Sequence, residues 1–519
     1  MKNLFILFIA FILINLPPIF AQEESESSFI DELKLPEGLG ISNQLEYSYD
    51  IHLKKEILEN WLNMDYRSGI FSTGIRLDIF QPNDPDPSVN RGKIRYADIS
   101  YKYISAEIGN KKEGLKVTLG NYYSFFGRGL ILKSYEDRNI RIDNNLLGVK
   151  VEAGYDNFYL TALSGMPEGL ESKRNDFLHA VDLEYRGVKN LKLGGTFASN
   201  TTEDENAART QLASLRAAAS IWNFDFYGEY GLKQNNDIKQ NIFNGNENFA
   251  GKAIYANLNF YIGSFSISTE YKLYDNFALT SGDGTVIYNT PPALRKDHTF
   301  MLLNRHPSPL DQTNEQGFQF DVNYTFSAET YINANYSLTK TLNESSYFQR
   351  ILGTKLPVRT QLNEIYLYGH HQWSDNFKTI AAVAYNEELS SDTKNVTPIL
   401  ENRFYFDDIN SIRFVVEHQS TKNNTTDEKY YTDAFTLEYL RSPDFSAALV
   451  SEMQTKEPIE GKLIRKLWTF VQFGYRLGEH TDISLLLGSR QAGNICIGGI
   501  CRYEPEFRGV ELKMITRLY

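Results

Sequence analysis

The chain has 519 residues, of which 13% are aromatic, and its 65 acidic and 53 basic residues give a formal net charge of −12. A surface that binds nucleic-acid phosphates should be basic, so this balance argues against nucleic acid as a partner. After its first residues the chain has no apolar run long enough for a membrane-spanning helix, which excludes a helical bundle. Its mean hydropathy of −0.40 looks like that of a soluble protein, but a transmembrane β-barrel has a similar average because half of each strand faces a polar interior.

The beginning of the chain resembles a secretory signal peptide, with one lysine, an apolar run over Leu4–Leu16 and a small residue at Ala21. The run is shorter than the roughly 20 residues of a membrane-spanning helix, which disfavours the alternative of a retained anchor. The residue directly after Ala21 is a glutamine and not a cysteine, so a lipoprotein is not expected. We expect a cleaved signal peptide at 1–21, a short periplasmic lead-in at 22–42 and one outer-membrane barrel at 43–519.

Apolar and polar residues alternate along almost the whole of the remaining chain. In residues 44–53, Leu45 and Tyr47 share one face with later apolar residues, while Glu46 lies on the opposite, polar face. Residues 317–326 repeat the pattern. Strict alternation predicts strands with one apolar and one polar face. Many of these runs have about 9–12 residues, the length that a tilted strand needs to cross a bilayer.

Connections between these strands alternate between short and long. Short turns are expected at 67–69, 154–156, 187–189, 442–444 and 478–480, and long connections at 81–93, 166–176, 200–210, 233–249 and 275–316. Short periplasmic turns opposite long extracellular loops are typical of outer-membrane barrels. The sequence therefore predicts an all-β, transmembrane, antiparallel up-and-down β-barrel of about 24 strands, within a range of about 22–26.

Tryptophan placement gives a weaker indication of the same fold. Trp222 and Trp373 lie beside expected short turns, whereas Trp61 and Trp468 lie near the starts of strands that follow long connections. Aromatic rings favour the two membrane interfaces, so we expect these residues in two aromatic girdles, although ordinary strand packing would also use tryptophan.

Residues 125–145 carry an unusual mixture of charges. A barrel of this size has a lumen too wide for wall side chains to fill, so water or inserted loops must occupy it. Opposed charges on an inserted loop would narrow the channel and set its selectivity. The alternative is an outer loop held together by weak surface ion pairs. The candidate lumen residues are Arg128, Lys133, Glu136, Asp137, Arg138, Arg141 and Asp143.

The long connection at 275–316 is the second candidate for an inward loop. Its candidate residues are Arg295, Asp297, His298, Arg305 and His306. The two histidines, with Asp297 and Asp311, could be drawn as a metal site, but their spacing matches no established metal motif. We therefore expect no bound metal.

Cys496 and Cys501 are the only cysteines. An exported protein folds in an oxidising compartment, and the glycines at 498–499 allow the tight turn that would bring the two sulfurs together. We expect a disulfide that stiffens one loop tip, since so small a ring adds little to global stability. A metal half-site is the alternative, but no other soft ligand lies nearby.

No motif in the chain indicates catalysis or a cofactor. We find no G-x-S-x-G elbow, P-loop or HExxH, and the adjacent His370 and His371 would point to opposite faces of a strand. A Ser/His/Asp site is recognised by geometry and stays open. The expectation is a protein that is not an enzyme and needs no cofactor.

Three segments resemble motifs of an uncharacterised family of Bacteroidota-type predicted outer-membrane β-barrel proteins, a domain of unknown function. They are NYYSFFGRGL from Asn121 to Leu130 with its continuation, PPALRKDH from Pro291 to His298 with LLNRHPSP, and ICIGGICRYEP around the cysteines. The resemblance covers most of the chain after the signal peptide. It implies a barrel in the outer membrane and brings no established activity.

The predicted function is a channel or transporter for hydrophilic solutes or for a threaded chain. A plug of the TonB-dependent kind is not expected, since only about twenty residues precede the first strand. The alternative is a structural or assembly component of an envelope, secretion or surface complex. The expected partners are outer-membrane lipid, the machinery that inserts barrels and other envelope proteins.

Overall fold

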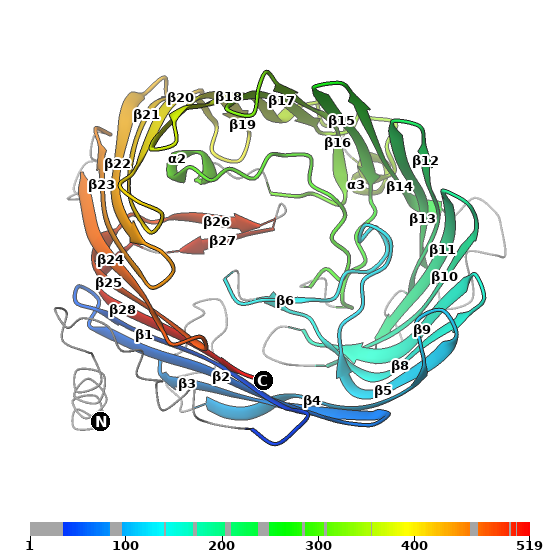
Figure 1. Cartoon of the computed structure of the whole chain (residues 1–519). Coiled ribbons are helices and arrows are strands. Elements are labelled where there is room, and N and C mark those ends of the chain that lie inside the picture. The colour runs from blue at the N-terminus through cyan, green and yellow to red at the C-terminus, as the bar shows by residue number, and fades with distance from the viewer. Residues whose placement is uncertain are drawn as a thin grey trace.

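The computed structural model describes residues 35–83, 96–139, 142–169, 174–202, 209–236, 249–282, 286–305, 309–353, 355–456, 466–497, 500–504 and 506–519. The predicted signal peptide at 1–21 lies outside these residues. A single sheet of 24 antiparallel strands forms a closed barrel (Figure 1), which confirms the predicted fold. The first strand begins at Leu39, ahead of the expected boundary at residue 43.

Each barrel strand pairs with its neighbours in chain order, and β1 closes the ring against β28, with Glu46 opposite Lys513. The first wall strands are β1 (Leu39–Asp50), β2 (Lys55–Ser68), β3 (Phe71–Pro82), β4 (Tyr96–Gly109), β5 (Gly114–Tyr122), β8 (Leu146–Tyr155), β9 (Phe158–Pro167), β10 (Asp176–Val188), β11 (Leu191–Thr202), β12 (Arg209–Ile221), β13 (Phe224–Asn236) and β14 (Phe249–Ile262). The second half comprises β15 (Phe265–Asp275), β16 (Asn314–Thr325), β17 (Thr330–Lys340), β18 (Thr360–Ser374), β19 (Phe377–Glu388), β20 (Thr393–Tyr405), β21 (Asn410–Asn423), β22 (Lys429–Arg441), β23 (Phe445–Gln454), β24 (Leu467–Leu477), β25 (Thr481–Arg490) and β28 (Phe507–Leu518).

The two faces of the sheet differ as the alternation predicted. On β3, Ile75 is 41% exposed on the outer face, whereas its neighbour Arg76 is 4% exposed and points into the lumen. On β12, Leu215 is 74% exposed and Arg216 is 8% exposed. An apolar outer surface over a polar interior suits a wall that is solvated by acyl chains.

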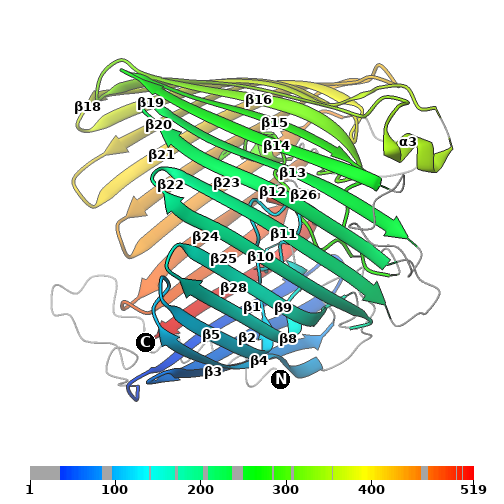
Figure 2. The same cartoon turned by 90° about the vertical axis from the view of Figure 1, so that its right-hand side faces the viewer.

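The connections segregate by length. Turns such as 69–70, 156–157 and 189–190 lie at one end of the barrel, where both Leu39 and Leu518 also lie. Long connections leave the other end, where α3 (Tyr347–Leu352) extends beyond the strands (Figure 2). Several short turns contain a residue of positive φ, including Asn190 at 61°. We call the two ends the short-turn end and the long-loop end.

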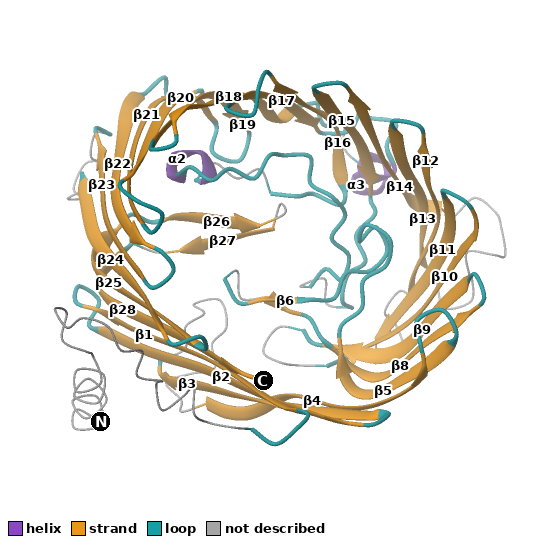
Figure 3. Cartoon of the chain, in the orientation of Figure 1, coloured by secondary structure: helices purple, strands orange, loops and turns teal. Residues whose placement is uncertain are grey.

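Two long connections and one hairpin enter the ring (Figure 3). The first lumen loop, residues 123–145, joins β5 to β8 and contains the small hairpin of β6 (Glu136–Asp137) and β7 (Ile142–Asp143). The second lumen loop, residues 276–313, joins β15 to β16 and contains α2 (Met301–Asn304). The lumen hairpin consists of β26 (Gly493–Ile497) and β27 (Ile500–Glu504).

The main apolar core lies between these loops and the inner wall. Leu130, Ile131 and Leu132 of the first lumen loop are each at most 1% exposed. They share one cluster with Phe277 and Leu279 of the second loop and with inward wall residues of β8 to β15. Burial of apolar surface therefore holds Leu130, Ile131 and Leu132 of the first loop and Phe277 and Leu279 of the second against the β8–β15 part of the wall.

The tryptophans only partly follow the expected girdles. Trp222 and Trp373 lie at short turns and are 94% and 64% exposed. Trp61 and Trp468 are 7% and 5% exposed, so the interface prediction was wrong for these two. Trp61 faces the lumen, where the guanidinium of Arg138 lies over its ring. Because loops fill the lumen, a tryptophan that faces inward can be buried there, and the pattern of short and long connections does not predict this. None of the helices among the described residues has the length and apolar character needed to cross a membrane.

Candidate functional site in the barrel lumen

The first lumen loop is fastened to the wall through Arg76 of β3. Its guanidinium lies 2.9 Å from a Glu136 oxygen and 2.5 Å from an Asp143 oxygen, both on the β6–β7 hairpin, and 3.1 Å from Asp78 of β3. The Arg76 side chain is only 5% exposed. A buried guanidinium needs such partners, because an uncompensated buried charge is strongly unfavourable.

Further contacts hold the same hairpin. Arg138 lies 2.8 Å from Glu136, donates to Gln44 of β1 at 3.2 Å and covers the ring of Trp61. The hydroxyl of Tyr123 donates to Asp143 at 3.0 Å. Contacts from β1, β2 and β3 thus hold the β6–β7 hairpin against the wall.

Burial also changes the acid–base behaviour of this loop. Burial lowers the pKa of Lys133, an effect that the nearby Asp137 carboxylate opposes. Burial, together with Asp137, raises the pKa of Tyr135 to about 12. Burial and the carboxylates of Asp143 and Glu136 raise the pKa of Tyr123. The tyrosines of the loop are therefore neutral hydrogen-bonding groups at physiological pH.

The two lumen loops are joined to each other. The side-chain amide of Asn289, which is fully buried, donates to the backbone oxygens of Leu130 and Phe277, each at 2.9 Å, and accepts from the backbone N–H of Leu279 at 2.7 Å. The backbone of Thr290 donates to Gly129 at 3.1 Å. One amide thus bridges both loops.

The tip of the first loop depends on glycine. Gly127 and Gly129 have φ values of +55° and +81°, a region that other residues rarely adopt. A Cβ on Gly127 would lie 2.7 Å from a carboxylate oxygen of Glu229. This close approach places Arg128 at the wall, with its guanidinium over the ring of Tyr227.

The second lumen loop is held by contacts spread over several strands. Lys296 lies 2.7 Å from Asp321 of β16 and donates to Asn333 of β17 at 2.8 Å. His298 lies 3.0 Å from Glu364 of β18, and both side chains are almost completely buried.

Helix α2 is anchored by two more wall carboxylates. Glu417 of β21 accepts the backbone N–H groups of Met301 and Leu302 at 3.0 and 2.8 Å. Arg305, just after α2, forms an ion pair with Glu452 of β23. Burial lowers the pKa of Arg305 to about 10, while Glu417 acts in the opposite direction.

Other candidate residues have different surroundings. Arg295 is half-buried, and Asp297 is exposed. Arg141 and His306 lie outside the described residues. Within the part of the chain that the structure describes, no three His, Cys, Asp or Glu side chains converge in a way that could hold a metal ion.

The cysteines lie directly opposite each other in the lumen hairpin, where the backbones of Cys496 and Cys501 pair across β26 and β27. Their side chains lie outside the described part, and the disulfide stays a prediction.

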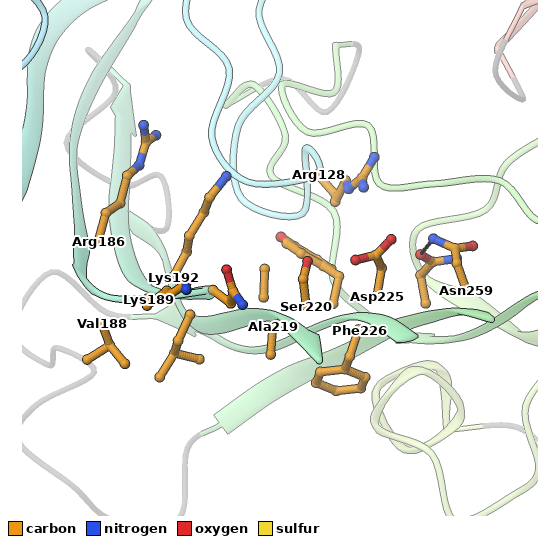
Figure 4. A pocket seen from close by; sticks show the side chains of 15 residues that line it. Arg128, Arg186, Val188, Lys189, Lys192, Ala219, Ser220, Asp225, Phe226 and Asn259 are labelled. Carbon is orange, nitrogen blue, oxygen red and sulfur yellow. Dashed lines mark hydrogen bonds between the residues drawn. The ribbon is translucent and has the colours of Figure 1, made fainter. Parts of the chain in front are cut away.

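Two of the cavities lined by described residues bear on the lumen. The smaller, of about 290 Å³, lies beside Arg138 and is lined by charges from β1, β2, β25 and β28, where Lys513 pairs with Glu46 and Arg490 with Glu511. The larger, of about 480 Å³, lies beside the β10–β11 turn at the short-turn end. Figure 4 shows the side chains that line it. We call the larger one the basic pocket. Its polar lining residues are Arg128, Arg186, Lys189, Asn190, Lys192, Ser220, Asp225, Tyr227, Asn257 and Asn259.

Sequence reasoning missed the wall residues that hold the loops. Arg76 and Asp78 occupy the polar face of an alternating strand and are only two positions apart. Opposite charges at that spacing on one polar face are a signal that could have identified them. The cations at the short-turn end carry no such local signal, since they come from separate connections and strands.

Known structures that resemble this chain include two that contain the P pilus usher PapC and one siderophore receptor. The translocation pore of the P pilus usher PapC has 10% identity and a TM-score of 0.47, over 92% of this chain and 98% of that chain. The E. coli P pilus tip assembly intermediate PapC-PapD-PapK-PapG has 9% identity and a TM-score of 0.51, over 96% of this chain and 63% of that chain. The siderophore receptor PirA from Pseudomonas aeruginosa has 9% identity and a TM-score of 0.44, over 94% and 81%.

Of these three, only the P pilus tip assembly intermediate has a TM-score above 0.5, and at 9% identity its likeness shows the fold alone. No curated protein matches the chain. The profile of the family of unknown function DUF6029 matches residues 1–518. The chain therefore belongs to this family.

Proposed function

We propose that this protein is an outer-membrane channel or transporter for hydrophilic solutes or a threaded chain, with passage limited by the two lumen loops. The supporting observation is that both loops leave the long-loop end, enter the lumen and are fastened there by charges of the inner wall. Charged groups held at a constriction favour hydrated solutes of selected charge.

The size of the barrel supports the same interpretation. A wall of 24 strands encloses more space than its own side chains fill, so the loops take the place that a separate plug occupies in other large barrels. Within this proposal, the chain is exported by a cleaved signal peptide, is inserted by the barrel machinery and belongs to the Bacteroidota-type group. It has no TonB-type plug and no enzymatic activity.

A structural or assembly role is the second candidate, and the density of the loop contacts favours it. Lys272 of β15 and Glu315 of β16, at the roots of the second loop, form an ion pair at 2.7 Å and are 3% and 1% exposed. Together with the shared apolar core, such contacts suit a permanently sealed barrel that anchors partners through its outer connections.

Conductance in a planar bilayer separates the two functions. We expect steady conductance from the refolded protein, and a larger one from a variant in which residues 125–143 are replaced by a short Gly-Ser linker. The matched control shortens the exposed β21–β22 connection at 424–427, on the same end of the barrel, and should leave conductance unchanged.

Silence of the intact protein, with conductance only after removal of the loop, would favour the sealed scaffold. Silence of both proteins, each shown to be folded by heat-modifiable gel mobility, would overturn the channel.

A further inference from the structure

Many lumen cations have a carboxylate partner, either on a lumen loop or on a neighbouring strand of the wall. They include Arg76, Arg216, Lys272, Lys296, Arg413 and Arg490. Their partners lie 2.7 to 3.1 Å away in four of these pairs, and the side chains are largely withdrawn from water. Two opposite charges in such a pair largely cancel, so the pair exerts only a weak electrostatic field on a solute in the lumen.

The basic pocket is different. Among the described residues, Arg128, Lys189 and Lys192 have no ion pair with a carboxylate, and all three are exposed and line the pocket. Arg186 also lines the pocket and pairs with Glu184. Asp225 is the single acidic residue of the lining. The pocket thus concentrates positive charge in a protein whose net charge is −12.

The positive groups approach the pocket from two directions. Lys192 rises from β11 and Arg186 from β10, and Figure 4 shows both on the same side of the strands as Asp225 and Arg128. Val188 points to the opposite side. Arg128 reaches the pocket from the tip of the first lumen loop, so a bound anion would touch wall and loop at once.

Neutral hydrogen-bonding groups complete the lining. Ser220 of β12 and the amides of Asn257 and Asn259 of β14 face the pocket. Asn259 donates to Asn257 at 3.0 Å, which orients both amides. Amides and hydroxyls beside cations are suited to a ligand that carries hydroxyl groups next to its charge.

We propose that the basic pocket binds a small hydrophilic anion in which a phosphate or carboxylate lies beside hydroxyl groups, as in a sugar phosphate or a sugar acid. The volume of about 480 Å³ lies within the range of about 300–1,000 Å³ found for small-molecule sites. The inference rests on the proposed function, because it names the class of solute that the channel takes.

Isothermal titration calorimetry of the whole detergent-solubilised protein tests the pocket directly. The probes are glucose 6-phosphate, glucuronate and inorganic phosphate, with glucose as the neutral comparison. We expect binding of at least one sugar anion, weaker binding of inorganic phosphate, none of glucose, and affinity that falls as salt rises.

Substitutions locate the site. Lys192→Gln and Arg128→Gln should each weaken binding about tenfold, the loss expected for one charge-assisted hydrogen bond. Lys378→Gln is the matched control, since Lys378 lies at the short-turn end of β19 outside the pocket. Its affinity should match that of the unaltered protein.

The outcomes separate this inference from the channel itself. Equal binding of glucose and its phosphate, no binding of any probe, or an equal loss in Lys378→Gln would each overturn the pocket. If the bilayer conducts in such a case, the proposed channel function is kept and only the anion-binding pocket is rejected. If sugar anions bind but the bilayer stays silent, the pocket stands and the channel falls.

Discussion

Positively charged side chains have opposite surroundings in two regions of the lumen. Arg76 is buried among Glu136, Asp143 and Asp78, so its charge holds the first lumen loop in place. Arg128, on the same loop, is exposed and has no carboxylate partner among the described residues. Ion pairing with carboxylates thus distinguishes the cations that hold the lumen loops in place from those that can bind a solute.

The largest expected effect comes from removing Arg76 from its cluster with Glu136, Asp143 and Asp78. Arg76→Met would leave three carboxylates close together without their common cation. Loss of one member of a buried ion pair costs about 3–5 kcal/mol. We expect the first lumen loop to detach from β3, with larger and noisier conductance in a bilayer and a lower temperature at which the compact gel form is lost.

Arg476→Met is the control for that variant. Arg476 pairs with Asp482 at 3.0 Å, but both side chains are nearly half exposed, and pairs of that kind contribute little. Unaltered conductance and thermal behaviour in Arg76→Met would show that the β6–β7 hairpin is held by something other than its charges.

A smaller effect is expected at the junction of the two loops. Asn289→Ala removes the amide that links Leu130 of the first loop to Phe277 of the second. Leaving these backbone groups without their partner costs about 1–3 kcal/mol. Because the first loop also carries Arg128, we expect a several-fold loss of sugar-anion affinity in calorimetry while the barrel stays folded.

Asn63→Ala is the control, since among the described residues this partly buried amide of β2 donates to Ser42 of β1 at 3.3 Å and contacts neither lumen loop. Its affinity should be unchanged. Full affinity in Asn289→Ala would mean that Arg128 is positioned by the Gly127–Gly129 turn alone.

Much of the architecture was predictable from local pattern. Alternation along strands such as 317–326 and the segregation of turn lengths led to a closed barrel of about 24 strands. The partners of the lumen loops were not predictable in this way. Arg76 and Glu136 are 60 positions apart, and their pairing depends on the course of a loop that has no periodicity.

The basic pocket was hidden for a related reason. Lys192, Ser220 and Asn257 lie on β11, β12 and β14, so only the lateral order of the strands brings them together. Mixed charges at 125–145 led to the first loop but left open whether it entered the lumen. Local alternation determines a strand's faces, whereas the neighbours of a loop depend on the closed ring.

The smallest effect is expected in the lumen hairpin, which lies outside both charged regions. Its base contacts the second lumen loop, because Arg305 of that loop donates to Gln491 and also pairs with Glu452. A Cys496–Cys501 disulfide would close a very short ring, which removes little entropy from the unfolded chain. Cys496→Ser should therefore leave thermal stability and sugar-anion affinity nearly unchanged.

Intact mass and thiol labelling of the unreduced protein check the bond itself. An oxidised pair resists labelling until the protein is unfolded and reduced, whereas free thiols react after unfolding alone. A large loss of stability in Cys496→Ser would mean that the hairpin supports Arg305 and the second loop. The position of the second lumen loop would then depend on the hairpin as well as on its ion pair between Arg305 and Glu452.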